Sequence, residues 1–550
     1  MPDPVSELEA ALGAAAAALR PDARAAETVE LRLERPKRAG QGDYATNAAM
    51  LLAPSLGSPA REIAAALGAE LARALGPSLA KYEVAGPGFL NLTLSDDWHR
   101  GALRALLAQG PRFGSGGAKT PQRILLEFVS ANPTGPIVAA SGRHAAYGDS
   151  LARILEHHGH SVSREYYVND AGAQVRRLAE SVRARARGQD PPPDGYQGEY
   201  VADLARQIPG AGDESLALSE LTERAVAAML DSIRATMDRY GVSYERYFSE
   251  RALHDGSPST VERALARLRD GGHIYEHEGA VWLRTTAYGD DKDRVLVRSD
   301  GEPTYFASDV AYMLDKRERG FERQILVVGA DHHGYVARLK AAFQALGGDP
   351  ELLEPVIMQL VHLVENDART KMSKRRGEFV TLDELIDEIG VDATRYFMLQ
   401  SSHERTLDLN LDLARTRSAE NPVYYIQYAH ARISSMLARL GQERVEQAIA
   451  ADSRWSSPAG ELHRSERDLV GKLLSLPEEI AEAAQRRAPH RIAAFALELA
   501  QQFTAFYRDC KVVGAKPAEV ESFRVALCLA SRTQLACVLG LLGVSAPEQM

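Results

Sequence analysis

The stretch FVSANPTGPIVAASGRHAAYGDSLARIL, residues 128–155, decides the fold class of this chain. Its first residues complete the apolar run RILLEFVS, which predicts a buried strand, and a loop rich in Pro and Gly follows. The remainder has the pattern of a helix over 142–158. A strand that turns into a helix is typical of a ligand-binding junction, although the turn from Val138 to Ser141 carries only small or apolar side chains.

Short strands and helices alternate after this junction, which favours a parallel sheet with helical crossovers. Further strands are predicted at 161–168, 324–328 and 356–364. A Pro-rich break interrupts the alternation in the middle of the chain. We therefore predict an α/β protein whose Rossmann-like parallel-sheet domain covers 123–392, with an insertion at about 188–295.

Two further domains flank the predicted sheet domain. Residues 1–95 combine helical patterns with the strand–turn–strand pattern YEVAGPGFLNLTL, which predicts a small N-terminal α/β domain. Residues 96–122 are expected to be a linker, because their second half is rich in Gly and polar residues. Residues 393–550 show helical patterns throughout, which predicts a C-terminal all-α domain.

Composition places the chain among globular proteins. Its 550 residues are 45% hydrophobic and 25% charged, and the net charge of −10 argues only weakly against a nucleic-acid partner. The cysteines Cys510, Cys528 and Cys537 are odd in number and form no C-x-x-C, so neither a disulfide framework nor a zinc site is expected. Reduced thiols, the lack of a signal peptide and the lack of a run of about 18 apolar residues suit a cytoplasmic protein.

Four loops would lie beyond the carboxyl ends of the strands, where open parallel sheets bind ligands. They are ANPTGP, YFASD, GADHHG and TKMSKRRG. The last offers Lys371, Lys374, Arg375 and Arg376, and such cations suit a polyphosphate, because they neutralise charge that develops on a leaving pyrophosphate. A solvated charge run is the alternative. The order K-M-S-K favours the first interpretation, since it matches the KMSKS signature of class I aminoacyl-tRNA synthetases.

Motifs over nearly the full length resemble bacterial arginyl-tRNA synthetase and keep its domain order. They are GDYATNAAMLLA, YEVAGPGFLNLTL, RILLEFVSANPTGP, YYVNDAGAQVRRLAE, GADHHGYVARLKAA, KMSKRRGEFVTLDELIDEIGVDATRYFML and NPVYYIQYAHARI. The resemblance implies ATP-dependent activation of L-arginine and its transfer to tRNA(Arg), by a protein that acts as a monomer. It also implies Mg²⁺ held by the ATP phosphates, with no metal site built from protein ligands.

The second class I signature, H-hydrophobic-G-H, is replaced by Val138, Ala139, Ala140 and Ser141. The family's two histidines contact ATP phosphates, so three interpretations stay open: a compensated active site, an impaired paralogue, or phosphate binding by the helix N-terminus alone. His144 lies three residues after Ser141 and is our candidate for a partial substitute. A packed or solvated helix histidine is the alternative.

By resemblance, the remaining site residues fall into three sets. Beside Ser141 and His144, catalysis is expected from Lys371 and Lys374, and ATP binding from Pro133, Gly135, Gly142, Met372 and Ser373. The arginine guanidinium, a planar cation, should meet Glu127, Tyr305 and Asp309, and its α-amino end Asn132 and His332. Anticodon contacts are expected from Tyr425, Gln427, Tyr428 and Arg432. Taken singly, each of these residues has a structural alternative, such as a helix cap for Asp309 or helix core for the tyrosines.

Two other functions remain as alternatives. Asp331-His332-His333 after an apolar strand also occurs in metal-dependent phosphoesterases, which would require further aspartates on other strands. If the missing histidines abolish activation, the chain would instead be a tRNA-binding protein without ligase activity. Whether the chain is an active synthetase or only binds tRNA, the resemblance implies that its N-terminal domain contacts the tRNA elbow. The contacts would come from the basic segment 32–38 and the loop Gln41–Asn47.

Overall fold

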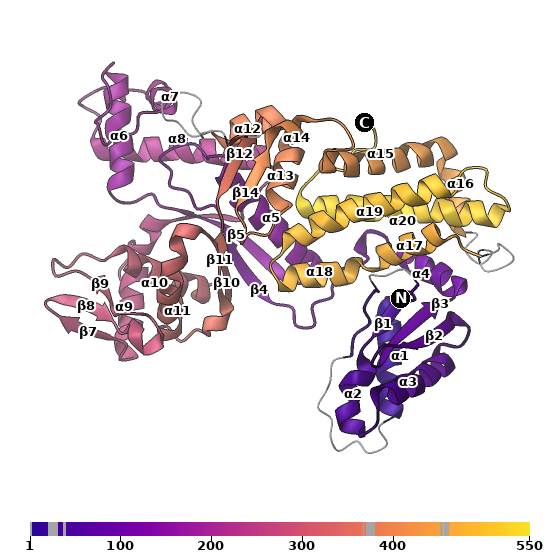
Figure 1. Ribbon diagram of the computed structural model, residues 1–550. Helices are drawn as coiled ribbons and strands as arrows, with labels where there is room; N and C mark the ends of the chain where they lie inside the picture. The colour runs from indigo at the N-terminus through magenta and orange to yellow at the C-terminus, as the bar shows by residue number, and fades with distance from the viewer. Residues whose placement is uncertain are drawn as a thin grey trace.

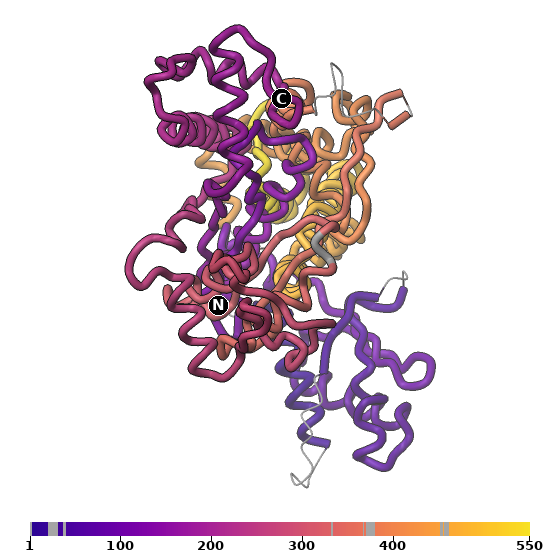
Figure 2. Tube along the Cα trace, turned by 90° about the vertical axis from the view of Figure 1, so that its left-hand side faces the viewer, coloured from indigo at the N-terminus to yellow at the C-terminus, as the bar shows by residue number. Residues whose placement is uncertain are grey.

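The computed structural model describes residues 3–19, 31–36, 40–366, 368–369, 380–450, 455 and 461–550, without the side chains of His332 and His333. The chain forms a sheet domain, a helical C-terminal domain beside it and an N-terminal domain that projects from the other two (Figures 1 and 2). The predicted α/β class is confirmed.

A five-stranded parallel sheet forms the centre of the protein. Its strands are β4 (Arg123–Glu127), β5 (Ser161–Val168), β6 (Arg246–Ser249), β10 (Arg323–Gly329) and β11 (Leu353–Met358). Their order is β11-β10-β4-β5-β6, and every pairing is parallel. The chain leaves β4 toward one edge and later returns to its other side, so the strand order reverses between β4 and β10. Ligands bind at such a switch point, beyond the carboxyl ends of the strands.

Helices cover the sheet and carry the site loops. They are α5 (Ser141–His158), α6 (Ala173–Ala186), α10 (Tyr305–Glu318) and α11 (Val336–Ala345). Helix α5 lies very close to the end of β4, because a Cβ on Gly148 would lie 2.2 Å from Cγ of Phe128. Glycine at this position therefore permits the approach of the helix to the sheet.

The prediction of one insertion at about 188–295 is wrong in part, because β6 lies inside it and pairs with β5 in the central sheet. The segment therefore consists of two insertions into the sheet domain, one before β6 and one after it. Together with α6, helices α7 (Glu199–Gln207) and α8 (Leu218–Arg239) enclose a small core of their own before β6. After β6 come α9 (Thr260–Asp270) and the antiparallel strands β7 (Ile274–His277), β8 (Ala280–Leu283) and β9 (Arg294–Val297).

The N-terminal domain has the predicted α/β composition. Its elements are α1 (Pro4–Ala18), β1 (Tyr44–Thr46), α2 (Ala48–Leu56), α3 (Ala60–Leu75), β2 (Leu79–Ala85) and β3 (Phe89–Leu94). The strands form an antiparallel sheet in the order β1-β3-β2, and the helices enclose a separate hydrophobic core.

The expected linker at 96–122 is wrong over its first half, which forms helix α4 (Asp96–Gln109). The Ser95 side chain caps this helix, and Leu103 and Leu106 are buried. Asp96 pairs with Arg467 of the C-terminal domain at 2.6 Å. Helix α4 therefore packs into the helical domain and fixes where the N-terminal domain emerges.

A small mixed sheet and two helices connect the sheet domain to the C-terminal helices. They are β12 (Val361–Glu365), β13 (Ala368–Arg369), α12 (Leu382–Ile389), α13 (Val391–Leu399) and β14 (Leu407–Asn410). Because β14 pairs in parallel with β12, the prediction that 393–550 is entirely helical is wrong at this strand.

The C-terminal domain is a helical bundle. Its helices are α14 (Leu411–Arg415), α15 (Pro422–Leu440), α16 (Gln442–Ala450), α17 (Arg464–Leu474), α18 (Leu476–Gln485), α19 (Pro489–Asp509) and α20 (Ala518–Leu542). Among the described residues only α20 is long and apolar enough to cross a membrane, and 67% of its apolar window is buried within the protein.

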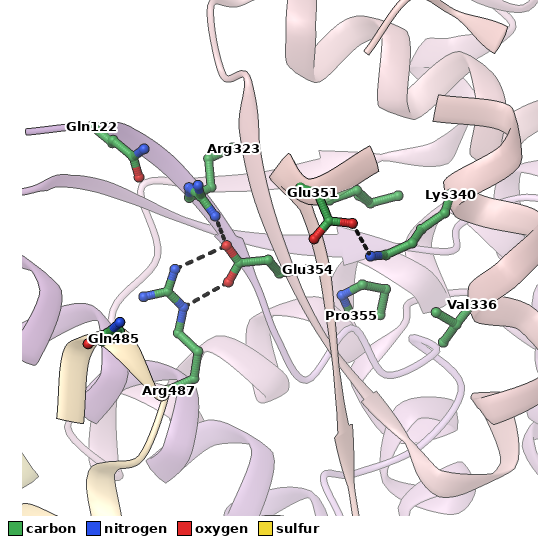
Figure 3. Close-up of a pocket in the computed structure, with 10 residues that line it drawn as sticks. Gln122, Arg323, Val336, Lys340, Glu351, Glu354, Pro355, Gln485 and Arg487 are labelled. Carbon is green, nitrogen blue, oxygen red and sulfur yellow. Dashed lines mark hydrogen bonds and ion pairs between the residues drawn. The ribbon is translucent and has the colours of Figure 1, made fainter. Parts of the chain in front are cut away.

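Ion pairs and hydrogen bonds join the bundle to the sheet domain. Glu354 on β11 accepts hydrogen bonds from Arg487, at 2.8 and 3.1 Å, and also pairs with Arg323, beside a cavity of about 600 Å³ (Figure 3). On α5, the Tyr147 hydroxyl donates to the Arg487 carbonyl at 2.6 Å, and Ser150 donates to a carbonyl of α20. The helix that begins at the altered signature is thus fixed to the C-terminal domain.

Candidate functional site

A strained turn at the end of β4 positions Glu127. Val129 and Ser130 have φ values of 70° and 44°, a region that β-branched residues rarely adopt. The Ser130 hydroxyl donates to Glu127 Oε1 at 3.1 Å and accepts from the Tyr167 amide at 3.1 Å. Backbone strain of this kind persists where surrounding contacts impose it, and it clusters at functional sites. The turn ties the Glu127 carboxylate to the end of β5.

Asp309 lies on the first turns of α10 and faces the same region. The Thr304 side chain caps the helix, and the Tyr335 hydroxyl donates to Asp309 Oδ2. Burial raises the pKa of Asp309 to about 6, and the Glu127 carboxylate contributes to the rise. Glu127 is therefore close enough to Asp309 to act on its pKa, and the contact of both acids with arginine stays a prediction.

Glu250 completes an acidic cluster that sequence analysis did not predict. It opens the short helix η3 (Glu250–Leu253) directly after β6 and is only 5% exposed. Burial and then the Asp309 carboxylate raise the pKa of Glu250 to about 7, while a hydrogen bond with Tyr167 opposes the rise. With its amide turned to donate, Asn169 reaches Glu250 Oε2 at 2.7 Å. A carboxylate at the end of a sheet strand could have indicated this residue, but the sequence pattern places the segment of β6 in the insertion and not in the central sheet.

The described part of the chain contains no ion-pair partner for Glu250 or Asp309. Two neighbouring carboxylates whose pKa values lie near neutrality are poorly stabilised as anions without a cation. A planar guanidinium has five N–H donors and can bond to two carboxylates at once. The arrangement therefore suits a guanidinium ligand.

Glu127 differs from these two acids, because it already has a cationic partner. Lys316 Nζ donates to Glu127 Oε2 at 2.6 Å. With Ser130 on the other oxygen, both carboxylate oxygens of Glu127 are bonded within the protein. The expected direct contact between Glu127 and an arginine ligand would have to displace or share these bonds.

Two other predicted residues lie at exposed positions near the acids. Tyr305 is 64% exposed, and its hydroxyl lies 3.5 Å from the position a Cβ would take on Gly172. Asn132 donates to Gln174 Oε1 at 2.7 Å. Both therefore lie by the loop that follows β5. The side chain of His332, the remaining predicted arginine contact, lies outside the described residues.

The altered signature turn is held by the segment that precedes α12. The Ala139 amide donates to the Val380 carbonyl, and the Leu382 amide donates to the Ile137 carbonyl, both at 2.8 Å. A Cβ on Gly142 would lie 2.7 Å from Cδ1 of Leu382, so this glycine is packed against α12.

Nearby, Pro133 is buried and Gly135 lies against the Tyr200 ring, whose hydroxyl donates to the Thr134 carbonyl at 2.8 Å. Ser141 begins α5, and His144 is partly buried one turn later. Lys371, Met372, Ser373 and Lys374 lie outside the described residues.

Comparison with known proteins decides the family. The family models described as "Arginyl tRNA synthetase N terminal domain", "tRNA synthetases class I (R), catalytic domain" and "DALR anticodon binding domain" match residues 6–94, 212–434 and 426–550. An arginine–tRNA ligase from Frankia alni is 46% identical to this chain, and the alignment covers 100% of the chain and 99% of that protein. The chain belongs to the arginyl-tRNA synthetase family. A second such ligase, from Moorella thermoacetica, is 44% identical over 99% of this chain and 100% of its own length.

The synthetase fold is also shared with a solved structure. The arginyl-tRNA synthetase of Thermus thermophilus matches with a TM-score of 0.76 at 24% identity, covering 99% of this chain and all of that chain. Family membership over the whole chain contradicts the phosphoesterase interpretation of Asp331-His332-His333. Within the described ranges no group of three or more His, Cys, Asp or Glu residues is placed to hold a metal ion.

The C-terminal domain of the synthetase carries a pocket of about 550 Å³ with aromatic and cationic walls. Tyr428 is 47% exposed and stacks on Tyr424, and the Arg432 guanidinium lies 4.5 Å from the centroid of the Tyr507 ring. Arg439, Arg444 and Met550 also line it. Exposed aromatic rings beside guanidinium groups are typical of sites that bind unpaired bases.

The other two predicted tRNA contacts make bonds within the domain. Gln427 is 8% exposed, and its amide donates to Asp392 at 2.8 Å and to Ser545 at 3.0 Å. It joins α15 to the chain after α20, and this placement speaks against a contact with tRNA. Tyr425 is partly buried, and its hydroxyl donates to Thr504 at 3.0 Å.

Proposed function

We propose that this chain is an arginine–tRNA ligase, which uses ATP to activate L-arginine and transfers the arginyl group to the 3′ end of tRNA(Arg), releasing AMP and pyrophosphate. The full-length relatives named for this activity support it. The observation that carries the choice of amino acid is the pair of carboxylates formed by buried Glu250 and partly buried Asp309, without a described cationic partner. Their geometry suits a guanidinium group.

In this proposal Glu250 and Asp309 bind the guanidinium of arginine. Tyr167 and Tyr335 bond to these carboxylates and hold them in place. Tyr305, at the exposed side of the cluster, would cover the bound side chain. Asn132 and His332 remain our candidates for the α-amino end of the substrate.

The chemistry follows in two transfers. The carboxylate of arginine attacks the α-phosphate of ATP, and pyrophosphate leaves. The terminal ribose hydroxyl of tRNA then attacks the arginyl carbonyl, and AMP leaves. We assign the ATP contacts to Pro133, Gly135 and Gly142 and to the segment with Met372 and Ser373, and the stabilisation of the leaving pyrophosphate to Lys371 and Lys374. Mg²⁺ accompanies ATP and is bound by its phosphates.

The altered signature sets the expected rate of the first step. Losing one donor to the transition state typically costs about 10²–10³ in rate, and Val138 and Ser141 stand where the family has two histidines. The amides of Ser141, Gly142 and Arg143 already donate to the carbonyls of Val138, Ala139 and Ala140, which speaks against phosphate binding by the helix N-terminus alone. The side chain of His144 is our candidate for partial compensation. We therefore propose an active enzyme whose adenylate formation is slow.

ATP–pyrophosphate exchange with tRNA present tests this assignment. Restoring both histidines, by Val138→His with Ser141→His, should raise the exchange rate about 10²-fold or more. His144→Ala should lower the rate of the unaltered chain. An unchanged rate in the restored variant would show that the turn does not contact ATP, and an unchanged rate in His144→Ala would remove that residue from catalysis.

An aminoacylation assay with arginine and total tRNA tests the function as a whole. Charging should depend on ATP and should fall in Glu250→Gln through a raised KM for arginine. Glu318→Gln, on the exposed end of α10, is a matched control and should charge normally. If the protein binds tRNA tightly but charges nothing, the tRNA-binding alternative is correct.

The remaining assignments are proposals of the same kind. Tyr428 and Arg432 would contact the anticodon, with Tyr425 at the edge of the contact, and the N-terminal domain would touch the tRNA elbow. We propose a cytoplasmic monomer with domains at 1–95, 123–392 and 393–550. In this division α4 belongs structurally with the C-terminal helices.

A further inference from the structure

Arg143, two residues after the altered signature, is a buried arginine. It is 1% exposed, and its guanidinium donates to the backbone carbonyls of Gln359 at 3.0 Å, Arg405 at 2.9 Å and Ser402 at 2.8 Å. Within the described part of the chain no carboxylate pairs with it. Burial lowers the pKa of Arg143 to about 10, so the side chain is still a cation at neutral pH.

The three carbonyls belong to two loops of the sheet domain. Gln359 directly follows β11, at the carboxyl end of that strand, and the other two lie in the loop between α13 and β14. The Gln359 amide donates to the His403 carbonyl at 2.9 Å, which bonds one loop to the other. Arg143 therefore joins the start of α5 to two loops that lie between 216 and 262 positions away in the sequence.

A second side chain of α5 contacts the same loop. Tyr147 follows Arg143 by four residues and so lies on the same face of the helix. Its ring centroid lies 5.3 Å from that of His403, and its hydroxyl donates to the Arg487 carbonyl at 2.6 Å. The first two turns of α5 are thus fixed by side chains that contact distant segments.

The altered turn itself is attached on its other side. The Ala139 amide donates to the Val380 carbonyl, and Gly142 packs against Leu382 of α12. Arg143 supplies the second attachment, to the loops at the end of β11 and before β14. The turn to which we assign contacts with ATP is therefore held from two directions.

Stability is a weak explanation for a cation at this position. The positive end of a helix dipole disfavours a cation in the first turn, and burial without an anion adds to the cost. The hydrogen bonds to carbonyls offset these costs only while the guanidinium keeps its place. Its donors point in fixed directions within one plane, so it sets the spacing of the groups that it joins. An apolar side chain could fill the same space but could not set that spacing.

We propose that Arg143 is a positioning residue for adenylate formation, whose guanidinium holds the altered turn and the start of α5 at a fixed place against the loops beyond β11. The residue is buried and acts through the turn, without contact with the substrate. This inference rests on the proposed function, because it takes the turn to contact ATP. In-line attack requires aligned atoms, and a misplacement of about 1 Å can cost about 10²-fold in rate.

ATP–pyrophosphate exchange with arginine and tRNA present, measured against ATP concentration, tests the inference. Rates of the unaltered chain, Arg143→Met and Arg143→Lys are divided by the folded fraction from urea titrations. Arg143→Met should lower kcat about 10²-fold and change the KM for ATP by about twofold or less, because the lost alignment matters in the transition state. Arg143→Lys should lose only about tenfold, since its ammonium has three donors for the same carbonyls.

Arg153 offers a matched control further along the same helix. Its guanidinium also donates to backbone carbonyls, those of Gly540 at 3.3 Å and Gly241 at 3.4 Å, and it pairs with Asp149. Arg153→Met removes bonds of the same kind at a distance from the altered turn. It should lower the free energy of unfolding and leave kcat per folded molecule unchanged.

A merely structural role would lower the folded fraction without lowering kcat per folded molecule. An unchanged kcat per folded molecule in Arg143→Met would overturn the inference, and so would an equal loss in Arg153→Met. If Arg143→Met does not fold, Arg143→Lys decides, and a kcat per folded molecule equal to that of the unaltered chain would again overturn it. An unaltered chain that catalyses no exchange would refute the proposed function, and this inference with it.

Discussion

Arginine should bind this protein about 20-fold more weakly at pH 6 than at pH 8. The reason is that Glu250, with a pKa of about 7, and Asp309, with a pKa of about 6, must both be ionised to pair with the guanidinium. Protonation raises the apparent Kd by (1 + 10^(7−pH))(1 + 10^(6−pH)), a factor of about 22 at pH 6 and about 1.1 at pH 8. Carboxylates with ordinary pKa values would change the Kd by only about 3% over the same range.

Calorimetric titration of the full chain with arginine measures this directly. Because both folded-state pKa values are raised, arginine affinity is fully present above pH 7 and is lost as the pH falls through 7 and then 6. At pH 7 binding should also release about 0.6 proton, which shows as a dependence of the heat on the buffer. Glu250→Gln should bind more weakly and reduce the pH effect to about twofold or less. A Kd that is constant from pH 8 to pH 6 would refute the reasoning.

Three further predictions concern the scaffold and the tRNA pocket. Gly148→Ala should lower the free energy of unfolding by about 1–3 kcal/mol in urea titrations, because its methyl would overlap the Phe128 ring; an unchanged midpoint would contradict the close packing. Arg395→Met should lower the free energy of unfolding by about 3 kcal/mol or more, since it removes charge-assisted hydrogen bonds to Asp149 and to two backbone carbonyls. An unchanged free energy of unfolding would show that these bonds do not stabilise the fold. Tyr428→Ala should weaken tRNA binding by about 1–3 kcal/mol without changing the Kd for arginine; unaltered tRNA affinity would remove the residue from the interface.

The fold was largely predictable because its central strands are apolar runs separated by helical patterns. The strand predicted at 161–168 is β5 without a shift at either end. Strand β6 escaped prediction because it has four residues, RYFS, and starts with a charged one. Its place in the sheet depends on pairing with β5, which is a long-range interaction that local periodicity does not record. Helix α4 was missed for the related reason that its buried face is created by the C-terminal helices.

The site was predictable only in part. The sequence places Asp309 and Glu127 on loops at one edge of the sheet, and in the structure Glu127 is close enough to act on the pKa of Asp309. The partner of Glu127 was not foreseeable, because Lys316 is 189 positions away and reads as one of several basic residues at a helix end. Glu250 was hidden by the misassigned β6. Each of these features depends on contacts between residues far apart in the sequence, which residue type and local pattern do not indicate.

A crystal structure of the full chain with bound L-arginine tests the central claim most directly. We predict that the guanidinium bonds to the carboxylates of Glu250 and Asp309 at about 2.7–2.9 Å, the distance expected for charge-assisted hydrogen bonds. An arginine located away from Glu250 and Asp309 would contradict the account.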